Sequence, residues 1–356
     1  MYRLTSKMDT KELPEGLLYG MGNPLLDISA DVPANYLDKY GLKPNDAILA
    51  EPKHLPIYQE LVDNYQVEYI AGGATQNAIR VAQWMLQKPF TTSYIGCIGK
   101  DEFGKQLQKQ ATNDGVRVQY LVDDAAPTGT CACLITEKVR SLVANLGAAN
   151  NYKYDHLKMP ENWALVEKAQ YVYIAGFFLT VSVESILAVG KHCAEMNKYF
   201  MMNLSAPFIP LAFKDQLMSV MPYIDILVGN EAEGDAISKA LDLGTSDLKE
   251  IAMKCAQFPK VNAKRERVVI ITQGASDIFL CKDGKVTPFP ILPISEEEIL
   301  DTNGAGDAWV GGFLSQLVQG RTVEQSMHGG NYAANVVIKR SGCTFPPKPD
   351  FKPPSV

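Results

Sequence analysis

Continuous apolar runs alternate along the chain with segments whose apolar residues recur at helical spacing. The runs predict strands, several of them apolar throughout as in strands covered on both faces, at residues 17–22, 67–71, 92–99, 171–178, 199–206, 224–230 and 267–274. Helical patterns lie between them, at residues 75–87, 101–113, 183–197, 231–241 and 246–258. This alternation predicts an α/β fold in which a mostly parallel central sheet is flanked by helices.

Two segments interrupt the alternation. Residues 25–70 have a mixed pattern, and residues 127–147 predict two strands joined by a short charged turn. We expect these two pieces to form one small, discontinuous, β-rich lid domain (25–70 and 127–147), with residues 1–24, 71–126 and 148–356 forming the large catalytic domain. A lid that closes over a cleft excludes water from a reaction. The proline-rich end, residues 345–356, is expected to be irregular.

Charge and cysteine usage narrow the class of protein. The 356 residues carry a formal net charge of -6 and no long basic run, so neither nucleic acid nor a membrane surface is an expected partner. No membrane span and no signal peptide are expected, because no run of eighteen apolar residues occurs and residues 1–16 lack an apolar core. The 7 dispersed cysteines indicate reduced thiols and a cytosolic or nuclear location. Cys131 and Cys133 lack CxxC spacing and a second pair, so zinc is not expected.

The stretch DTNGAGD at residues 301–307 leads from a loop into an apolar helical pattern. Gly304 and Gly306 allow a close approach of backbone to ligand, and free N–H groups at a helix start attract an anion. An aspartate in such a place suits a general base beside a hydroxyl that attacks phosphorus. The alternative interpretation is a simple helix cap at Asp307. A P-loop is excluded, because Asp101 and not Ser or Thr follows Gly99-Lys100.

Further motifs resemble a known family in order and nearly end to end. They are GNPLLDIS (22–29), AGGATQNAIRVAQWM (71–85), TGTCACLIT (128–136), RSLVANLGAAN (140–150), YIAGFFLTVS (173–182), NLSAPF (203–208), VGNEAE (228–233) and DTNGAGDAWVGGFLSQLV (301–318). Together they resemble the ribokinase-like sugar and nucleoside kinases, and within these the eukaryotic adenosine kinase family. The resemblance implies a monomer that transfers the γ-phosphate of ATP to the 5′-hydroxyl of adenosine, with Mg²⁺, in purine salvage.

The resemblance also implies which residues act on the phosphate. Asp307 matches the family's general base, and the N–H groups of Gly304, Ala305 and Gly306 match its anion hole. Arg140 matches an arginine that reaches the ATP phosphates when the lid closes, although an isolated arginine is most often a solvated surface charge.

A second set of positions matches the family's nucleoside site. Asp27 would accept hydrogen bonds from the ribose 2′- and 3′-hydroxyls, because a carboxylate offers two acceptors to two donors. The remaining sugar positions are Asn23, Gly72, Gly73 and Asn77. An apolar slot for the purine is implied at Leu49, Cys131, Leu142, Leu146, Phe177 and Phe208. Without the resemblance, the same residues would be interpreted as turns and core.

The nucleotide and metal positions come from the same comparison of motifs. ATP contacts are implied at Asn150, Asn230, Thr272, Gly274, Asn303 and Asn331. Asn230 and Glu233 would organise Mg²⁺ largely through water, since magnesium keeps several of its waters. Asn-x-x-Glu is also a helix capping box, and both interpretations can hold together.

Two departures and two rival functions stay open at this level. Ala74 stands where the family often has serine, and Asn331 stands where it often has histidine. Another sugar or nucleoside kinase is one rival, against which Leu49, Leu142, Leu146 and Phe177 favour a base over a free sugar. A catalytically silent nucleoside-binding protein is the other, and it would require the loss of Asp307 or the anion loop.

Overall fold

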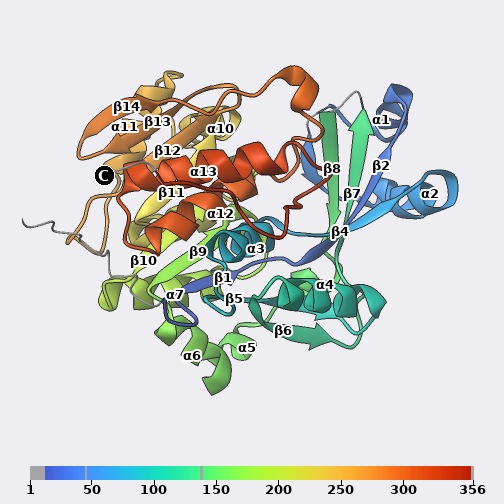
Figure 1. Cartoon of the computed structure of the whole chain (residues 1–356), viewed down its shortest axis with the longest axis horizontal. Coiled ribbons are helices and arrows are strands. Elements are labelled where there is room, and N and C mark those ends of the chain that lie inside the picture. The colour runs from blue at the N-terminus through green and yellow to red at the C-terminus, as the bar shows by residue number, and fades with distance from the viewer. Residues whose placement is uncertain (1–12, 45, 137–138, 354–356) are drawn as a thin grey trace, which may run out of the picture.

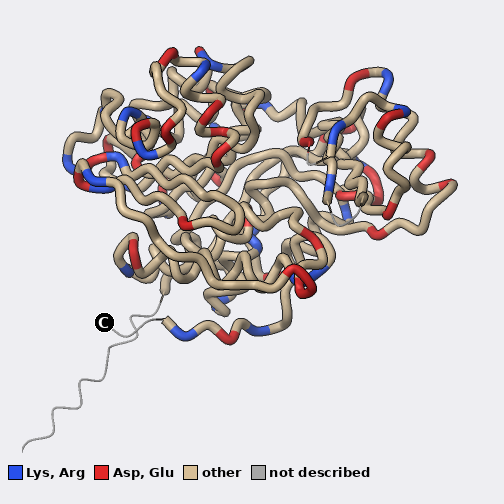
Figure 2. The backbone as a smooth tube through the Cα atoms, turned by 90° about the horizontal axis from the view of Figure 1, so that it is seen from above, with Lys and Arg blue, Asp and Glu red and all other residues tan. Residues whose placement is uncertain are grey.

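The computed structural model describes residues 13–44, 46–136 and 139–353 (Figure 1). The expectations for residues 1–12, for the charged turn at 137–138 and for the last three residues lie outside this part of the chain. Within it, no helix is both long and apolar enough to cross a bilayer. Lysine and arginine are interspersed with aspartate and glutamate along the tube of Figure 2.

A nine-stranded sheet forms the centre of the larger part of the molecule, in the order β14-β13-β12-β11-β10-β9-β1-β5-β6. In this order, each neighbouring pair from β12 through β11, β10, β9, β1 and β5 to β6 is parallel. The pairs β12–β13 and β13–β14 are antiparallel. The strands are β1 (Leu18–Met21), β5 (Thr92–Gly99), β6 (Arg117–Asp123), β9 (Tyr171–Ala175), β10 (Tyr199–Asn203), β11 (Ile226–Asn230), β12 (Val268–Gln273), β13 (Ser276–Lys282) and β14 (Lys285–Phe289). This is the predicted mostly parallel central sheet, and the ribokinase-like α/β fold class is confirmed.

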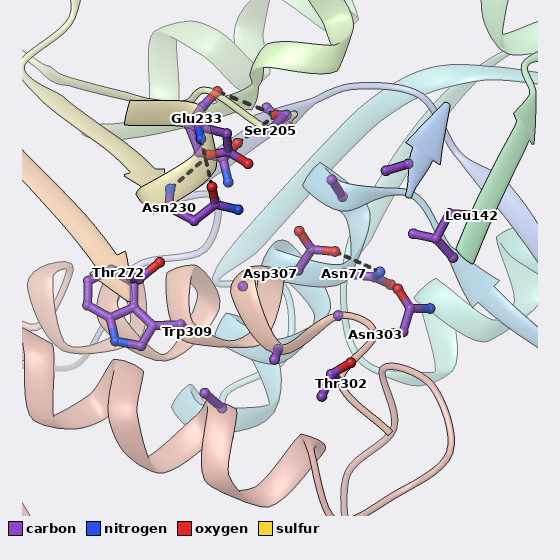
Figure 3. Close-up of a pocket in the computed structure, with 18 of the residues that line it drawn as sticks. Asn77, Leu142, Ser205, Asn230, Glu233, Thr272, Thr302, Asn303, Asp307 and Trp309 are labelled. Carbon is purple, nitrogen blue, oxygen red and sulfur yellow. Dashed lines mark hydrogen bonds between the residues drawn. The ribbon is translucent and has the colours of Figure 1, made fainter. Parts of the chain in front are cut away.

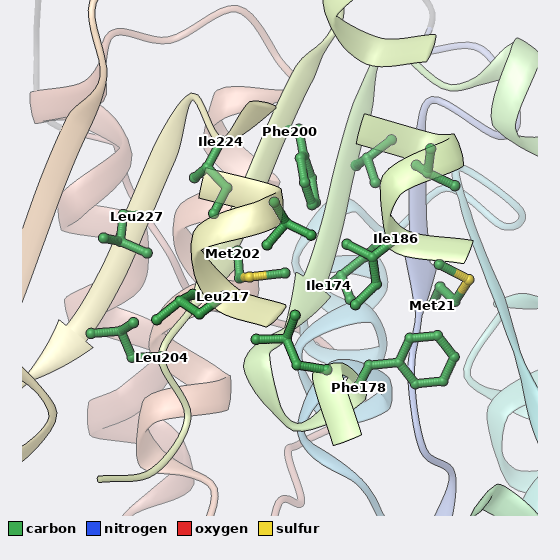
Figure 4. Packing of buried hydrophobic residues seen from close by; sticks show 14 of the residues in the cluster. Met21, Ile174, Phe178, Ile186, Phe200, Met202, Leu204, Leu217, Ile224 and Leu227 are labelled. Atoms are coloured by element: carbon green, nitrogen blue, oxygen red, sulfur yellow. The ribbon is translucent and has the colours of Figure 1, made fainter. Parts of the chain in front are cut away.

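Helices cover both faces of this sheet. They are α3 (Ala74–Leu86), α4 (Glu102–Asn113), α5 (Tyr154–Lys158), α6 (Pro160–Lys168), α7 (Val183–Glu195), α8 (Phe208–Ala212), α9 (Lys214–Val220), α10 (Glu231–Ala240), α11 (Leu248–Ala256), α12 (Ala305–Leu317) and α13 (Val323–Val337). One core cluster joins the sheet to α7, α9, α10 and α11, and Figure 4 shows Ile174, Phe200 and Met202 packed there. A second cluster joins the other face to α3, α12 and α13.

A second, five-stranded sheet draws its strands from two separate parts of the chain. Its order is β3-β8-β7-β2-β4, with β2 (Leu25–Asp31), β3 (Ala47–Leu49), β4 (Glu68–Gly72), β7 (Thr130–Thr136) and β8 (Val139–Asn145). Helices α1 (Ala34–Tyr40) and α2 (Pro56–Asn64) cover one face, with Ile28, Leu37 and Leu61 in a core of its own. Figure 1 shows this sheet standing at one end of the molecule. Strand β4 crosses the domain boundary predicted at 70/71, and the domain division itself stays a prediction.

Three predicted strands differ from the structure. The run 67–71 forms a strand, but it pairs with β2 in the second sheet. Hydrophobic spacing predicts a strand without predicting which strand it pairs with. The run 171–178 is a strand only to Ala175, and the run 199–206 only to Asn203. The chain instead turns at η3 (Gly176–Thr180), where the Phe177 N–H donates to Ser205 Oγ at 3.3 Å. Both strands therefore end where the chain turns toward the cavity described below.

We predict that Gly312→Ala destabilises the fold at the contact of α12 with α13. A Cβ at Gly312 would lie 2.6 Å from the Ala333 Cβ and would overlap the Gly329 carbonyl, and neither group can rotate away. Overpacking of this kind costs roughly 1–3 kcal/mol of unfolding free energy. Urea denaturation measures it.

The matched control is Gly234→Ala in α10, where a Cβ would meet mainly the mobile end of Leu248 at 3.1 Å. Alanine is the better helix former, so this variant should change the unfolding free energy by less than about 1 kcal/mol. Equal losses in the two variants would show that close packing at Gly312 is not the cause.

Candidate active site

A cavity of about 640 Å³ lies between the second sheet and the ends of the central strands. It takes side chains from β2, β3, β7 and β8 on one side, and from the segments that follow β1, β9, β10, β11 and β12 on the other. Ligands of open parallel sheets bind outside the carboxyl ends of the strands, which is where this cavity lies. Its size suits a small-molecule ligand.

The start of α12 forms one wall of the cavity. Gly304 has a φ of 72°, in the left-handed region, and a Cβ there would lie 2.9 Å from the Cys343 Cβ, so the turn requires glycine. Gly304, Ala305 and Gly306 line the cavity as predicted. The first N–H groups of a helix have no partner within it. The Ala305 N–H makes a 3.3 Å hydrogen bond to the Thr302 carbonyl.

Asp307 lies in the first turn of α12, with Asn77 of α3 beside it (Figure 3). The Asn77 Nδ2 donates to Asp307 Oδ2 at 3.0 Å. Burial raises the pKa of Asp307 to about 7, the Asn77 hydrogen bond lowers it, and the charges of Asp27 and Glu233 raise it further. A carboxylate whose pKa lies near neutral pH is suited to accept a proton as a general base.

We predict that Asn77→Ala moves the acid limb of the pH profile of kcat/KM to higher pH. Activity requires the deprotonated base, so it falls as pH falls through the pKa of Asp307. Removal of the donor raises that pKa, and a hydrogen bond to a charged group corresponds to about 1–2 pH units. Asn303→Ala, which alters another cavity amide without touching Asp307, should leave the limb in place. An unmoved limb in Asn77→Ala would contradict the pairing.

Asp27 of β2 lies buried on the opposite wall. Gly72 makes room for it, because a Cβ at that position would lie 2.5 Å from the carboxyl carbon of Asp27. Burial raises the pKa of Asp27 to about 7, and the positive charges of Arg140 and Arg80 lower it. Asn23 also lines the cavity, and both atoms of its amide are buried without a partner among the described residues. Unpaired buried polar atoms that face a cavity suit a polar ligand such as a diol.

The predicted apolar slot is present as one continuous lining. Leu49, Cys131, Leu142, Leu146, Phe177 and Phe208 all line the cavity, as do the sugar positions Gly73 and Asn77. The rings of Phe177 and Phe208 lie 6.0 Å apart at 41°. These side chains form a wall suited to a flat aromatic group.

The predicted nucleotide positions Asn230, Glu233, Thr272, Gly274, Asn303 and Asn331 also line the cavity. Asn230 and Glu233 form the capping box of α10, with hydrogen bonds of 2.8 and 3.0 Å. Asn331 accepts from Trp309 Nε1 at 3.0 Å and donates to the Pro290 carbonyl at 2.9 Å. It therefore holds the Pro290 loop against α12, and one N–H and one lone pair of its amide are left for a ligand.

Three predicted site residues do not line the cavity. Gly72 acts through the space that it leaves for Asp27, and Asn150 is exposed in η2 (Gly147–Asn151). Arg140 is buried, and its Nε lies 2.6 Å from Asp301 Oδ1. In this conformation Arg140 therefore joins β8 to the loop before α12, and its predicted contact with phosphates stays a prediction.

Other lining residues were not predicted. They include Thr180, Ser205, Ile291, Leu292, Ile294, Ile299, Thr302 and Trp309. The apolar residues of PILPISEEEIL (290–300) could have been predicted to line a cavity, because they belong to no predicted helix or strand. Ser205 lies within the quoted motif NLSAPF, but its turn conformation, with a φ of 70°, is evident only in the structure.

Comparisons with known proteins agree with this fold. The model of the pfkB family of carbohydrate kinases matches residues 34–350, and the chain belongs to that family. Adenosine kinase 1 of Arabidopsis thaliana is 57% identical over 95% of this chain and 98% of its own length. The structure of Anopheles gambiae adenosine kinase in complex with P1,P4-di(adenosine-5) tetraphosphate has a TM-score of 0.93 and 52% identity, over 95% of this chain and 100% of that one. Schistosoma mansoni adenosine kinase in complex with 2-fluoroadenosine has a TM-score of 0.91 and 38% identity, over 94% and 98%.

Proposed function

We propose that this protein is an adenosine kinase, which transfers the γ-phosphate of ATP to the 5′-hydroxyl of adenosine and produces AMP and ADP for purine salvage. The observation that carries the proposal is one cavity that brings together a buried carboxylate, Asp27, an apolar slot, and a second carboxylate at a helix start, Asp307. The related kinase structures in complex with P1,P4-di(adenosine-5) tetraphosphate and with 2-fluoroadenosine support the same ligands.

Each wall of the cavity has a part in the reaction. Asp27 and Asn23 hold the ribose, and the apolar slot holds the purine, so that the 5′-hydroxyl points toward Asp307. Asp307 takes the hydroxyl proton at its free carboxylate oxygen while Asn77 holds the other oxygen. The N–H groups at the start of α12 stabilise charge on the phosphoryl group in transfer. A free sugar would leave the apolar slot unfilled, which disfavours the rival sugar kinase.

The residues present fit a Mg²⁺ ion held mostly through water. Burial raises the pKa of Glu233 to about 7, and no lysine or arginine among the described residues forms an ion pair with it. Glu231 lines the same part of the cavity and adds a second carboxylate. When bound, Mg²⁺ neutralises charge on the phosphates of ATP. Asn230 and Glu233 would hold its water shell, and their capping box fixes both side chains at the start of α10.

Oligomeric state and location belong to the same proposal. We propose a monomer, because one face of the second sheet is covered by α1 and α2 and the other lines the cavity, which leaves neither for a second copy. A cytosolic or nuclear location is supported by the cysteines, all seven of which are buried and free.

A coupled ADP-release assay tests the function. ATP and Mg²⁺ are offered with adenosine, inosine, guanosine or ribose, and adenosine is expected to be by far the best acceptor. Turnover led by ribose would overturn the assignment of the apolar slot and favour the rival sugar kinase. Binding of adenosine without turnover on any acceptor would favour the silent binding protein.

A further inference from the structure

Three ligand side chains of metal-binding type converge on the cavity face of the second sheet. Asp27 lies on β2, and Cys131 and Cys133 lie on the same face of β7, because side chains two apart on a strand share a face. Strands β2 and β7 are parallel and in register, with Asp27 opposite Cys131. The Asp27 carboxylate and the two thiol sulfurs lie within 4.8 Å of one another, and all three residues are buried.

A fourth polar atom without a partner lies beside them. Ser29 is two residues beyond Asp27 on the same face of β2 and opposite Cys133 in the register. The side chain is 3% exposed, and its Oγ makes no hydrogen bond to any described residue. A buried hydroxyl normally has a partner, so Ser29 provides an observation independent of the cysteines. The face thus offers two sulfurs and two oxygens, the number of ligands in a tetrahedral site.

The charges around this face do not exclude a cation. Arg140 and Arg80 act on Asp27 and would repel a positive ion. Each arginine is already paired with another carboxylate, Arg140 with Asp301 and Arg80 with Asp114, both at 2.6 Å. The two pairs are neutral together, so the charge left on this face is that of the Asp27 carboxylate.

The donor set selects the kind of ion, and the buried oxygens of Asp27 and Ser29 supply the ligands that the two cysteines by themselves lacked. Magnesium prefers oxygen ligands in an octahedron, whereas thiolates select thiophilic metals such as zinc and cadmium. Ligand atoms that lie at about 2.0–2.3 Å from a tetrahedral ion are separated by roughly 3.3–3.8 Å. The three ligand atoms lie within 4.8 Å of one another, so binding of an ion requires them to draw closer together.

We propose that Asp27, Cys131 and Cys133, with Ser29 or a water as the fourth ligand, form a binding site for one thiophilic divalent cation, with Cd²⁺ as the probe. Binding releases the two thiol protons to solvent and forms two metal–sulfur bonds. The ion occupies the carboxylate that the ribose would use, so it competes with the nucleoside. The site itself rests only on this geometry, while the competition rests on the proposed function.

The direct test is a titration of the ligand-free protein with CdCl₂ in a buffer without chelator or thiol. We expect one Cd²⁺ per chain and a thiolate-to-cadmium charge-transfer absorption in the ultraviolet. Cys133→Ser removes one sulfur without altering a residue that lines the cavity, and should weaken Cd²⁺ binding at least about tenfold. Cys281→Ser, which removes another buried thiol on β13, is the matched control and should bind Cd²⁺ as the unaltered protein does. Circular dichroism of both variants checks that they fold.

Competition is measured separately. Saturating adenosine should lower the apparent Cd²⁺ affinity by at least about tenfold, and Cd²⁺ should raise the KM for adenosine with little change in kcat. Turnover of Cys133→Ser should persist at Cd²⁺ concentrations that inhibit the unaltered protein. Equal Cd²⁺ affinity in Cys133→Ser and Cys281→Ser, or no charge-transfer absorption at all, would overturn the site. The charge-transfer absorption with Cd²⁺, together with no phosphorylation of any acceptor in the absence of Cd²⁺, would support the metal site and overturn only the proposed function.

Discussion

Asp307→Asn is expected to lower kcat by a factor of roughly 10²–10⁴, the usual contribution of a general base. Asparagine keeps the volume of the side chain and can still accept the hydrogen bond from Asn77, so the start of α12 should keep its shape. It cannot take the proton of the attacking hydroxyl. The measurement is steady-state ADP release across pH 5 to 9, where the residual activity should no longer follow a group with a pKa of about 7.

Binding separates this effect from a misfolded site. Asp307 repels the phosphates that bind beside it, so the asparagine variant should bind ATP as tightly as the unaltered protein or more tightly. Adenosine affinity, measured by calorimetry, should change little, because Asp27 and the apolar slot are intact. A kcat within tenfold of the unaltered protein would assign the base to another residue, and Asp307 would then be a helix cap.

Asp301→Ala is expected to lower the unfolding free energy by roughly 3–5 kcal/mol, because it leaves a buried arginine without its partner. The side chains of Asp301 and Arg140 are 2% and 3% exposed. Asp301 also accepts hydrogen bonds from the N–H groups of Asn303, at 2.8 Å, and of Gly342, so its loss leaves one part-buried and one buried donor unpaired. Urea denaturation measures the change in free energy.

Removal of Arg140 should lower the unfolding free energy by less than removal of Asp301 does. In Arg140→Met the abandoned carboxyl can take up a proton, and burial already raises the pKa of Asp301 despite the opposing charge of Arg140. An arginine without its partner stays charged, so it cannot reduce the cost of its burial by losing a proton. Lys39→Met, which breaks the exposed pair of Lys39 with Glu60, is the control and should cost less than about 1 kcal/mol. Equal losses in Asp301→Ala and Lys39→Met would show that the buried pair is not held as the structure places it.

Local pattern was enough to predict most of the secondary structure that builds the site. The glycines and the aspartate of DTNGAGD indicated a helix start that binds an anion, and α12 begins at Ala305. Apolar runs predicted β1, β5 and β11 to within two residues, because a strand covered on both faces must be apolar along its length. Strands β13 and β14 were missed, because the apolar run of β13 is short, at residues 278–281, and β14 has no such run.

The sequence by itself determined the fold class, the family resemblance and the type of most of the cavity residues, because these depend on spacing along the chain and on side-chain chemistry. Only the tertiary structure decided which residues meet across long separations. Asn77 binds Asp307 from 230 positions away, and Asp27 faces Cys131 and Cys133 through the register of two strands. The partner of Arg140 was likewise decided by burial, because a guanidinium removed from water takes the nearest carboxylate, and that is Asp301.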